Sequence, residues 1–190
     1  CNPTYAYCYA QYARMYQVQI TGPEGTVLDN SSGYTCYTYY EDPNPELIPG
    51  NTYTITARIY KYYYSYFRLF IDWDKNYVFK NDTYQEYYGY QYVYSPGYNY
   101  RNMTRTFTVP IDAEGEYRMR LMASYQQNYY YNPSPYQYIR DMSDACLNGY
   151  YYDYCNAYGY AYNYGYGETE DYRFKVAAGV NDTYPSDGDI

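Results

Sequence analysis

The sequence predicts an all-β protein: an antiparallel β-sandwich, jelly-roll or immunoglobulin-like, with long tyrosine-rich loops. Two observations carry this prediction. Roughly seven short segments alternate apolar and polar residues, and Gly- or Pro-containing turns separate them. Helical periodicity is nearly missing, apart from a short helix expected at residues 143–148. We expect one domain over residues 1–176 with a tyrosine-rich insertion at about 129–166, and a tail or linker at residues 177–190.

The first strands are predicted within residues 16–28, where a strand, a turn at residues 22–25 and a second strand follow one another. Residues 45–60 repeat this order around a turn at residues 49–51. Strict alternation in this second pair indicates a sheet with one buried side. The buried face would carry Tyr53, Ile55, Ala57 and Ile59, and the solvent face Thr52, Thr54, Thr56 and Arg58.

A central strand is predicted within residues 67–78, because Phe67, Leu69 and Ile71 share one face of an apolar run. Two more strands are expected at residues 104–110 and 116–123, on either side of an acidic turn. The last strand, residues 171–176, alternates three apolar side chains with polar ones and would close the domain; its apolar residues are Tyr172, Phe174 and Val176.

Tyrosine dominates the composition, with 42 Tyr against 5 Phe and 1 Trp. A buried phenol must find a hydrogen-bond partner, so most of these rings are expected at surfaces rather than in a core. A minority, such as Tyr53, Tyr117 and Tyr172, occupy ordinary strand positions.

Two stretches, residues 88–94 and 158–166, place Tyr at every second position, which puts the rings on one face of an extended backbone. Such faces usually mark contact sites, and self-association is favoured over the alternative that the rings cover their own sandwich. The residues predicted to self-associate are Tyr88, Tyr90, Tyr92, Tyr94, Tyr158, Tyr160, Tyr162, Tyr164 and Tyr166.

The formal charge of −8 and the absence of histidine narrow the choice of partners and chemistry. Phosphate binding needs clustered Lys and Arg, so a nucleic-acid partner is not expected. Without histidine, the commonest general base and transition-metal ligand are missing. No run of 18 or more apolar residues is present, so no membrane span is expected.

The five cysteines contain no CxxC pair, which argues against zinc and for disulfides in an oxidising compartment. Two short loops are candidate closures, one from Cys1 to Cys8 and one from Cys146 to Cys155. Because the number is odd, one thiol is left free, buried or paired with another chain. A chain that begins at Cys1 is expected to be a processed product or part of a longer protein. The candidates are Cys1, Cys8, Cys36, Cys146 and Cys155.

Four Asn-x-Ser/Thr sequons are present, and they predict N-glycosylation on surface loops if the source organism glycosylates Asn. They begin at Asn30, Asn81, Asn102 and Asn181.

The segment Gly-Glu-Thr-Glu-Asp-Tyr at residues 167–172 resembles the signature of the GEVED domain, a module of secreted bacterial multidomain proteins. Residues 1–4, 71–76, 107–110 and 118–121 resemble other segments of this family in the same order. The resemblance implies an extracellular β-sandwich within larger surface proteins, with no catalytic role of its own.

This chain departs from the family at Tyr77, where glycine is usual, and in the long insertion at residues 129–166. These departures suggest a specialised member.

The segment Asp72-x-Asp74-x-Asn76 has the spacing that points alternate oxygens at a Ca²⁺ ion, and Asp82 could complete the set. A calcium loop normally needs glycine at the next position, where this chain has Tyr77. A solvated acidic turn is therefore the favoured alternative, and no other cofactor is expected.

Glu168, Glu170 and Asp171 provide the minimum carboxylate pair of a glycosidase. The sequence contains no nucleophile or metalloprotease motif. We favour a structural role for these groups, as acceptors of hydrogen bonds from Arg118 or Arg120 across the sheet.

The leading functional hypothesis is an extracellular or cell-surface structural subunit that assembles with copies of itself through tyrosine-rich surfaces. The alternative is a carbohydrate-binding or adhesion module whose aromatic rings stack on sugars. A glycosidase is the third and least favoured reading, and the chain is not expected to be an enzyme.

Overall fold

The computed structural model describes residues 13–33, 35, 37–76, 79, 87–125 and 166–178. For residues 13, 61–66, 87–96, 98, 124, 125 and 166 it describes only the backbone. These parts form strands, turns and loops, with no helix among them, and they contain no segment able to cross a bilayer as a helix. The strands are β1 (Ala13–Gly22), β2 (Gly25–Ser31), β3 (Tyr37–Tyr40), β4 (Glu46–Leu47), β5 (Thr52–Asp72), β6 (Tyr87–Thr108), β7 (Gly115–Tyr125) and β8 (Tyr166–Val176).

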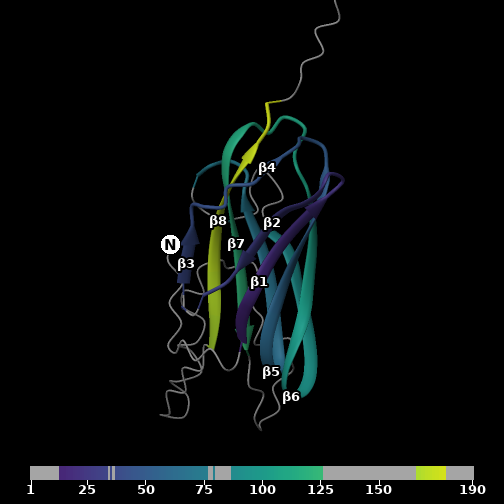
Figure 1. Ribbon diagram of the computed structural model, residues 1–190, viewed down its shortest axis with the longest axis vertical. Coiled ribbons are helices and arrows are strands. Elements are labelled where there is room, and N and C mark those ends of the chain that lie inside the picture. Colours follow the sequence, from purple (N-terminus) through teal and green to yellow (C-terminus); the bar gives the residue numbers. More distant parts are fainter. Residues whose placement is uncertain are drawn as a thin grey trace, which may run out of the picture.

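The strands form a sandwich whose two layers are halves of one continuous eight-stranded sheet (Figure 1). The first layer has the order β2-β1-β5-β6. The second has the order β6-β5-β7-β8, with β3 and β4 both pairing in parallel with β8. All the other pairs are antiparallel. The prediction of an all-β sandwich is therefore confirmed.

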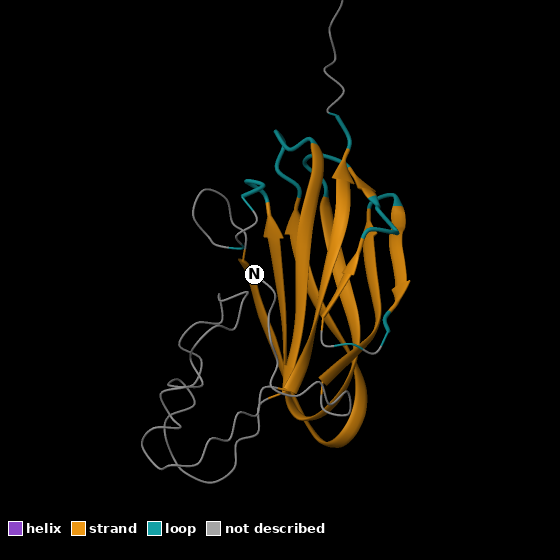
Figure 2. Ribbon diagram, turned by 90° about the vertical axis from the view of Figure 1, so that its left-hand side faces the viewer, coloured by secondary structure: helices purple, strands orange, loops and turns teal. Residues whose placement is uncertain are grey.

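The long strand β5 belongs to both layers. Its first half pairs with β1, where Ile55 lies opposite Ile20, and its second half pairs with β7, where Leu69 lies opposite Leu121. β6 follows β5 almost throughout, and Figure 2 shows long strands curving round the lower end of the molecule. The hairpin of β5 and β6 thus carries the sheet from one layer into the other.

This hairpin differs from the sequence-based prediction in two ways. Residues 45–60 and 67–78 were expected to contain separate strands, but residues 61–66 continue the extended backbone and join them into a strand of 21 residues. The tyrosine ribbon at residues 88–94 is part of β6 and pairs with β5. Alternating Tyr suits a strand, and the long-range pairing supplies the hydrogen bonds that keep both segments extended.

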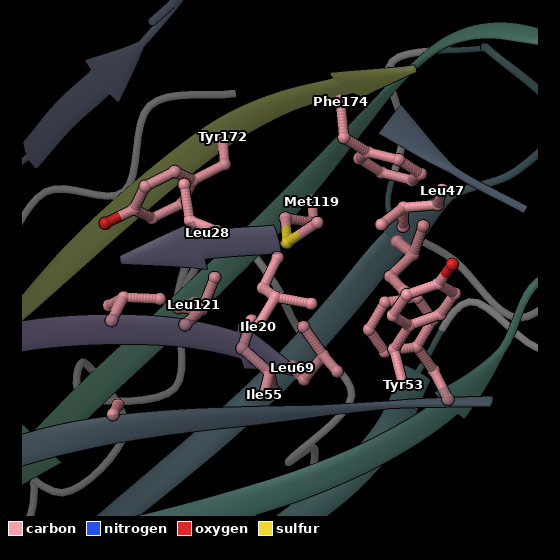
Figure 3. Close-up of a cluster of buried hydrophobic side chains, with 14 of the residues drawn as sticks. Ile20, Leu28, Leu47, Tyr53, Ile55, Leu69, Met119, Leu121, Tyr172 and Phe174 are labelled. Atoms are coloured by element: carbon pink, nitrogen blue, oxygen red, sulfur yellow. The ribbon is translucent and has the colours of Figure 1, made fainter. Parts of the chain in front are cut away.

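Apolar side chains from both layers meet in a single core (Figure 3). Ile20 and Ile55 from the first layer and Leu69, Met119 and Leu121 from the second are all fully buried. Burying each such side chain contributes about 1.5–3 kcal/mol. The faces predicted for residues 52–59 are confirmed, since Tyr53, Ile55, Ala57 and Ile59 are all inaccessible to solvent.

Trp73, directly after β5, closes one end of this core. Its ring lies 5.1 Å from Tyr117 and 5.6 Å from Phe174 in the second layer, and 6.4 Å from Phe107 in the first. Aromatic pairs at these distances add about 0.5–1.5 kcal/mol each beyond the area they bury. Trp73 therefore ties the two layers together where their strands end.

The tyrosines predicted at ordinary strand positions are buried, and each phenol has a partner. Tyr53 donates to Glu24 and accepts from the Ile48 amide at 2.9 Å, while Tyr117 accepts from the Glu114 amide at 3.0 Å. These hydrogen bonds offset the cost of taking the phenol out of water, which lets Tyr serve as a core residue here.

Candidate functional site

The outer face of the first layer carries an open groove of about 490 Å³. Strands β1, β5 and β6 build it, because residues that alternate with the buried ones point outward. None of the described residues that line it is acidic. These lining residues are Gln17, Gln19, Thr56, Arg58, Tyr100, Arg101 and Asn102.

An aromatic cluster borders this groove. The rings of Tyr16 and Tyr60 lie 5.2 and 4.9 Å from that of Tyr100, and the Tyr100 side chain is 42% exposed. The Arg58 guanidinium lies 4.8 Å from the Tyr100 ring, and that of Arg14 lies 4.1 Å from Tyr16. Cation–π contacts of this kind hold the rings in place at the surface.

The register of the sheet creates this cluster. Tyr100 lies opposite Tyr60, and Arg14 lies opposite Tyr60 on the other side. Tyr16 falls at a bulge in β1, between Met15 and Gln17. We had not predicted this cluster from the sequence. One signal was present, because extending the alternation of residues 52–58 by one step places Tyr60 on the outer face.

The charge on the outer face is not balanced. Asp29 of β2 accepts hydrogen bonds from Gln17 and Gln19 at 2.6 and 2.9 Å, and these bonds lower the pKa of its carboxyl. Asp29 therefore stays ionised at one edge of the face, while Arg58 and Arg101 lie in the groove. The outer face is thus locally basic in a chain whose formal charge is −8.

A second polar cluster lies in β8, in the segment 167–172. Glu168, Glu170 and Asp171 are 3%, 0% and 0% exposed. Alternation along the strand turns Glu168 and Glu170 toward the space between the layers, together with Tyr172, and turns Asp171 to the opposite side. This segment therefore places carboxylates on both faces of β8.

Asp171 is held by arginines of the neighbouring strand β7. Arg120 donates to its two carboxylate oxygens at 2.6 and 2.7 Å, and Arg118 donates at 3.2 Å. Burial alone would lower the pKa of Arg120, but the hydrogen bond and charge of Asp171 raise it. The predicted bonds from Arg118 and Arg120 are confirmed for Asp171.

Those bonds do not extend to Glu168 and Glu170, which face the other side of the strand. Glu168 accepts from the Met15 amide of β1 at 2.7 Å, and Glu170 accepts from the Tyr172 hydroxyl at 2.6 Å. Tyr172 in turn accepts from Asn30 of β2 at 3.0 Å. The bonds to Met15 and Asn30 cross the sandwich and join its layers.

Burial raises the pKa of Glu168 to about 8, and the nearby Glu170 charge adds to this effect. Burial also raises the pKa of Glu170. A glycosidase needs both carboxylates in contact with substrate in an open cleft. These two groups are enclosed between the layers, so their arrangement suits structural cohesion rather than hydrolysis.

The predicted calcium segment forms a compact turn after β5. The backbone amide of Asn76 donates to Asp72 and Asp74, both at 3.1 Å, and Lys75 has a positive φ of 59°. Asp82 lies outside the described residues. Within the described parts of the chain, no three Asp, Glu, Cys or His side chains are grouped to hold a metal ion. Calcium binding here stays a prediction.

The remaining predicted sites fall only in part on described residues. Asn102 is exposed on β6, whereas Asn30 is half-buried with its amide donating to Tyr172. Tyr88, Tyr90, Tyr92 and Tyr94 lie in β6 and Tyr166 begins β8, described by their backbone alone. The other predicted residues lie outside the described parts, as does the helix predicted at residues 143–148: Cys1, Cys8, Cys36, Asn81, Cys146, Cys155, Tyr158, Tyr160, Tyr162, Tyr164 and Asn181.

The family model of the GEVED domain matches residues 66–175, which is more than half of the chain. The chain belongs to the GEVED domain family. The matched region runs from the second half of β5 through β8. It therefore contains the arginines of β7, their partner Asp171 and the interior glutamates. In this GEVED domain the signature segment is the buried strand that joins the two layers.

Curated proteins give no significant match. Among solved structures, the chain is similar to the ASH or PapD-like domain of human CEP192 (PapD-like domain 7), at 9% identity and with a TM-score of 0.32. The similarity covers 86% of this chain and 88% of that one.

Proposed function

We propose that this GEVED domain is a non-catalytic, extracellular structural subunit that assembles with copies of itself into a filament or cell-surface layer. The observation that supports this most is the aromatic cluster of Tyr16, Tyr60 and Tyr100 on the outer face. Tyr rings with exposed hydroxyls suit interfaces that form from a hydrated surface. With 42 tyrosines in the chain, many such contacts could add up in a repeating interface.

Sedimentation and electron microscopy of the purified chain over a range of concentrations test this proposal. We expect species larger than the monomer at high concentration, and Tyr100→Ala is expected to weaken them. Tyr39→Ala is the matched control, because Tyr39 is 37% exposed, much as Tyr100 is, but lies on β3, away from the aromatic cluster. A chain that stays monomeric at the highest concentration would rule out self-assembly.

A second candidate function is carbohydrate binding, and the groove favours it. Its side chains offer amides, guanidinium groups and a hydroxyl beside the partly exposed Tyr100 ring, the combination that sugar hydroxyls and ring faces require. A glycan array with the monomeric chain would test it. Selective binding that Arg58→Ala and Asn102→Ala abolish would support this function. If the chain binds no glycan on the array, carbohydrate binding is ruled out.

A further inference from the structure

We propose that the groove on the outer face of the first layer binds short acidic oligosaccharides, with Arg58 holding the carboxylate of a uronic acid unit. This inference rests on carbohydrate binding, the second function proposed above, and it names the class of glycan and the residue that selects it.

Arg58 lies at the centre of the groove floor. It stands opposite Gln17 of β1 on one side and Asn102 of β6 on the other, so the three side chains form a row across the layer. Because neighbouring strands lie about 4.8 Å apart, this row is about 10 Å wide. Arg58 and Asn102 are exposed, and all three residues line the groove. A ligand in the groove therefore meets a guanidinium group between two amides.

The charge of Arg58 is not neutralised by a carboxylate. In the second layer, Arg120 binds the buried Asp171, but Arg58 makes no ion pair with any residue that the structure describes. Its guanidinium lies 4.8 Å from the centre of the Tyr100 ring. This cation–π contact restricts the side chain and brings no negative charge. Arg58 thus keeps the planar fork with which arginine binds both oxygens of a carboxylate.

Asp29 of β2, the nearest strand with a carboxylate, does not occupy this fork. Strand β1 lies between β2 and β5, and Gln17 and Gln19 on it donate to Asp29 at 2.6 and 2.9 Å. The amide nitrogens of both glutamines are used in these bonds, which leaves their side-chain oxygens as acceptors. Sugar hydroxyl groups can donate to such oxygens. The groove therefore combines a cation for a carboxylate with acceptors for hydroxyl groups.

The net charge of the chain favours a short ligand over a long acidic polymer. The formal charge is −8, so the rest of the protein repels polyanions, and this repulsion reaches about 8–10 Å at physiological ionic strength. The groove has a volume of about 490 Å³, within the range of about 300–1,000 Å³ that small-ligand sites occupy. An oligosaccharide of a few units could place one carboxylate on Arg58 and extend little beyond the groove.

Calorimetric titration of the monomeric chain with trigalacturonic acid tests this proposal, and the methyl ester of the same trisaccharide is the first comparison. The ester keeps the sugar rings but carries no charge, so we expect it to bind at least about tenfold more weakly. A triglutamate peptide with blocked ends carries three carboxylates without a sugar. It should also bind at least about tenfold more weakly, because it has no hydroxyl groups for the glutamine oxygens.

Substitution of Arg58 tests its role. Arg58→Gln should weaken binding of the acid about tenfold and leave binding of the ester unchanged, while Arg58→Lys keeps the charge and should recover part of the affinity. Arg173→Gln is the matched control, because it removes the same charge from a side chain on β8 that is 32% exposed. Unchanged melting temperatures confirm that the variants fold.

Equal affinities for the acid and the ester, or an equal loss of both in Arg58→Gln, would overturn the preference for uronic acids and leave carbohydrate binding in place. A peptide that binds as tightly as the acid would show that the groove recognises charge alone. If neither trisaccharide binds, the uronic acid proposal fails, and the glycan array decides separately whether the chain binds other carbohydrates.

Discussion

Replacing Glu168 with glutamine should change how the stability of this domain depends on pH. The Glu168 side chain is 3% exposed, and it accepts a hydrogen bond from the Met15 amide across the sandwich. Burial raises its pKa from an ordinary value of 4.5 to about 8 in the folded chain. The folded state therefore binds this proton more tightly than the unfolded state between these two pH values.

The sign and size of the effect follow from that difference. Below pH 4.5 both states are protonated, so this group does not make stability depend on pH. The free energy of unfolding then falls as the pH rises from 4.5 through about 8, the pKa of Glu168 in the folded chain. At about 1.4 kcal/mol per pH unit, the loss from pH 4.5 to pH 9 is at most about 5 kcal/mol. Domains of this size are stable by about 5–15 kcal/mol, so the loss would be easily measured.

Glu168→Gln keeps the shape and the acceptor for the Met15 amide but carries no charge at any pH. We therefore expect urea unfolding at pH 5, 7 and 9 to show a flatter profile for the variant than for the wild type, with the variant the more stable at pH 9. Glu116→Gln is the control, because the Glu116 side chain is 52% exposed and should leave the profile unchanged. If Glu168→Gln loses as much stability as the wild type between pH 5 and pH 9, the reasoning fails.

Three further outcomes are expected. Asp171→Asn removes the carboxylate charge that the buried Arg120 guanidinium, 2% exposed, binds, and should cost about 3–5 kcal/mol in urea unfolding; a cost below about 1 kcal/mol would contradict a structural ion pair. Gly22→Ala places a methyl group 2.3 Å from the buried Tyr53 ring and should lower stability by about 1–3 kcal/mol, whereas an unchanged melting temperature would mean that the turn can shift. Calorimetric titration after chelation should give no heat at millimolar calcium if the turn at Asp72, Asp74 and Asn76 is the favoured solvated acidic turn; calcium-binding heat that Asp74→Asn weakens would show the calcium site instead.

The fold could be predicted wherever one side of a strand is buried. Alternation alone assigned Ile55 and Ile59 to the core and Arg58 to the solvent, because successive side chains of a strand point to opposite faces of the sheet. The signature segment was recognisable by its resemblance to the GEVED family, and its Asp171 pairs with the predicted arginines.

The features that were missed depend on pairing between distant segments. Nothing local distinguishes a tyrosine ribbon in a loop from one in a sheet, so the continuous course of β5 through residues 61–66 was not expected. The aromatic cluster arises because the register sets Tyr60 beside Tyr100, more than thirty residues later in the sequence. The inward orientation of Glu168 could have been predicted, since it shares its parity with Tyr172 and Phe174.

The position of β8 has a consequence for when this domain can fold. This strand, the last that the structure describes, pairs with β7, β3 and β4, and its side chains bond Met15 of β1 and Asn30 of β2. A chain still being synthesised therefore lacks the ladder partner of β3 and β4, and the side chains that bond Met15 and Asn30, until β8 has emerged. Contacts of such long sequence separation form slowly. The sandwich would thus close only after nearly the whole described sequence, from β1 to β8, has been made.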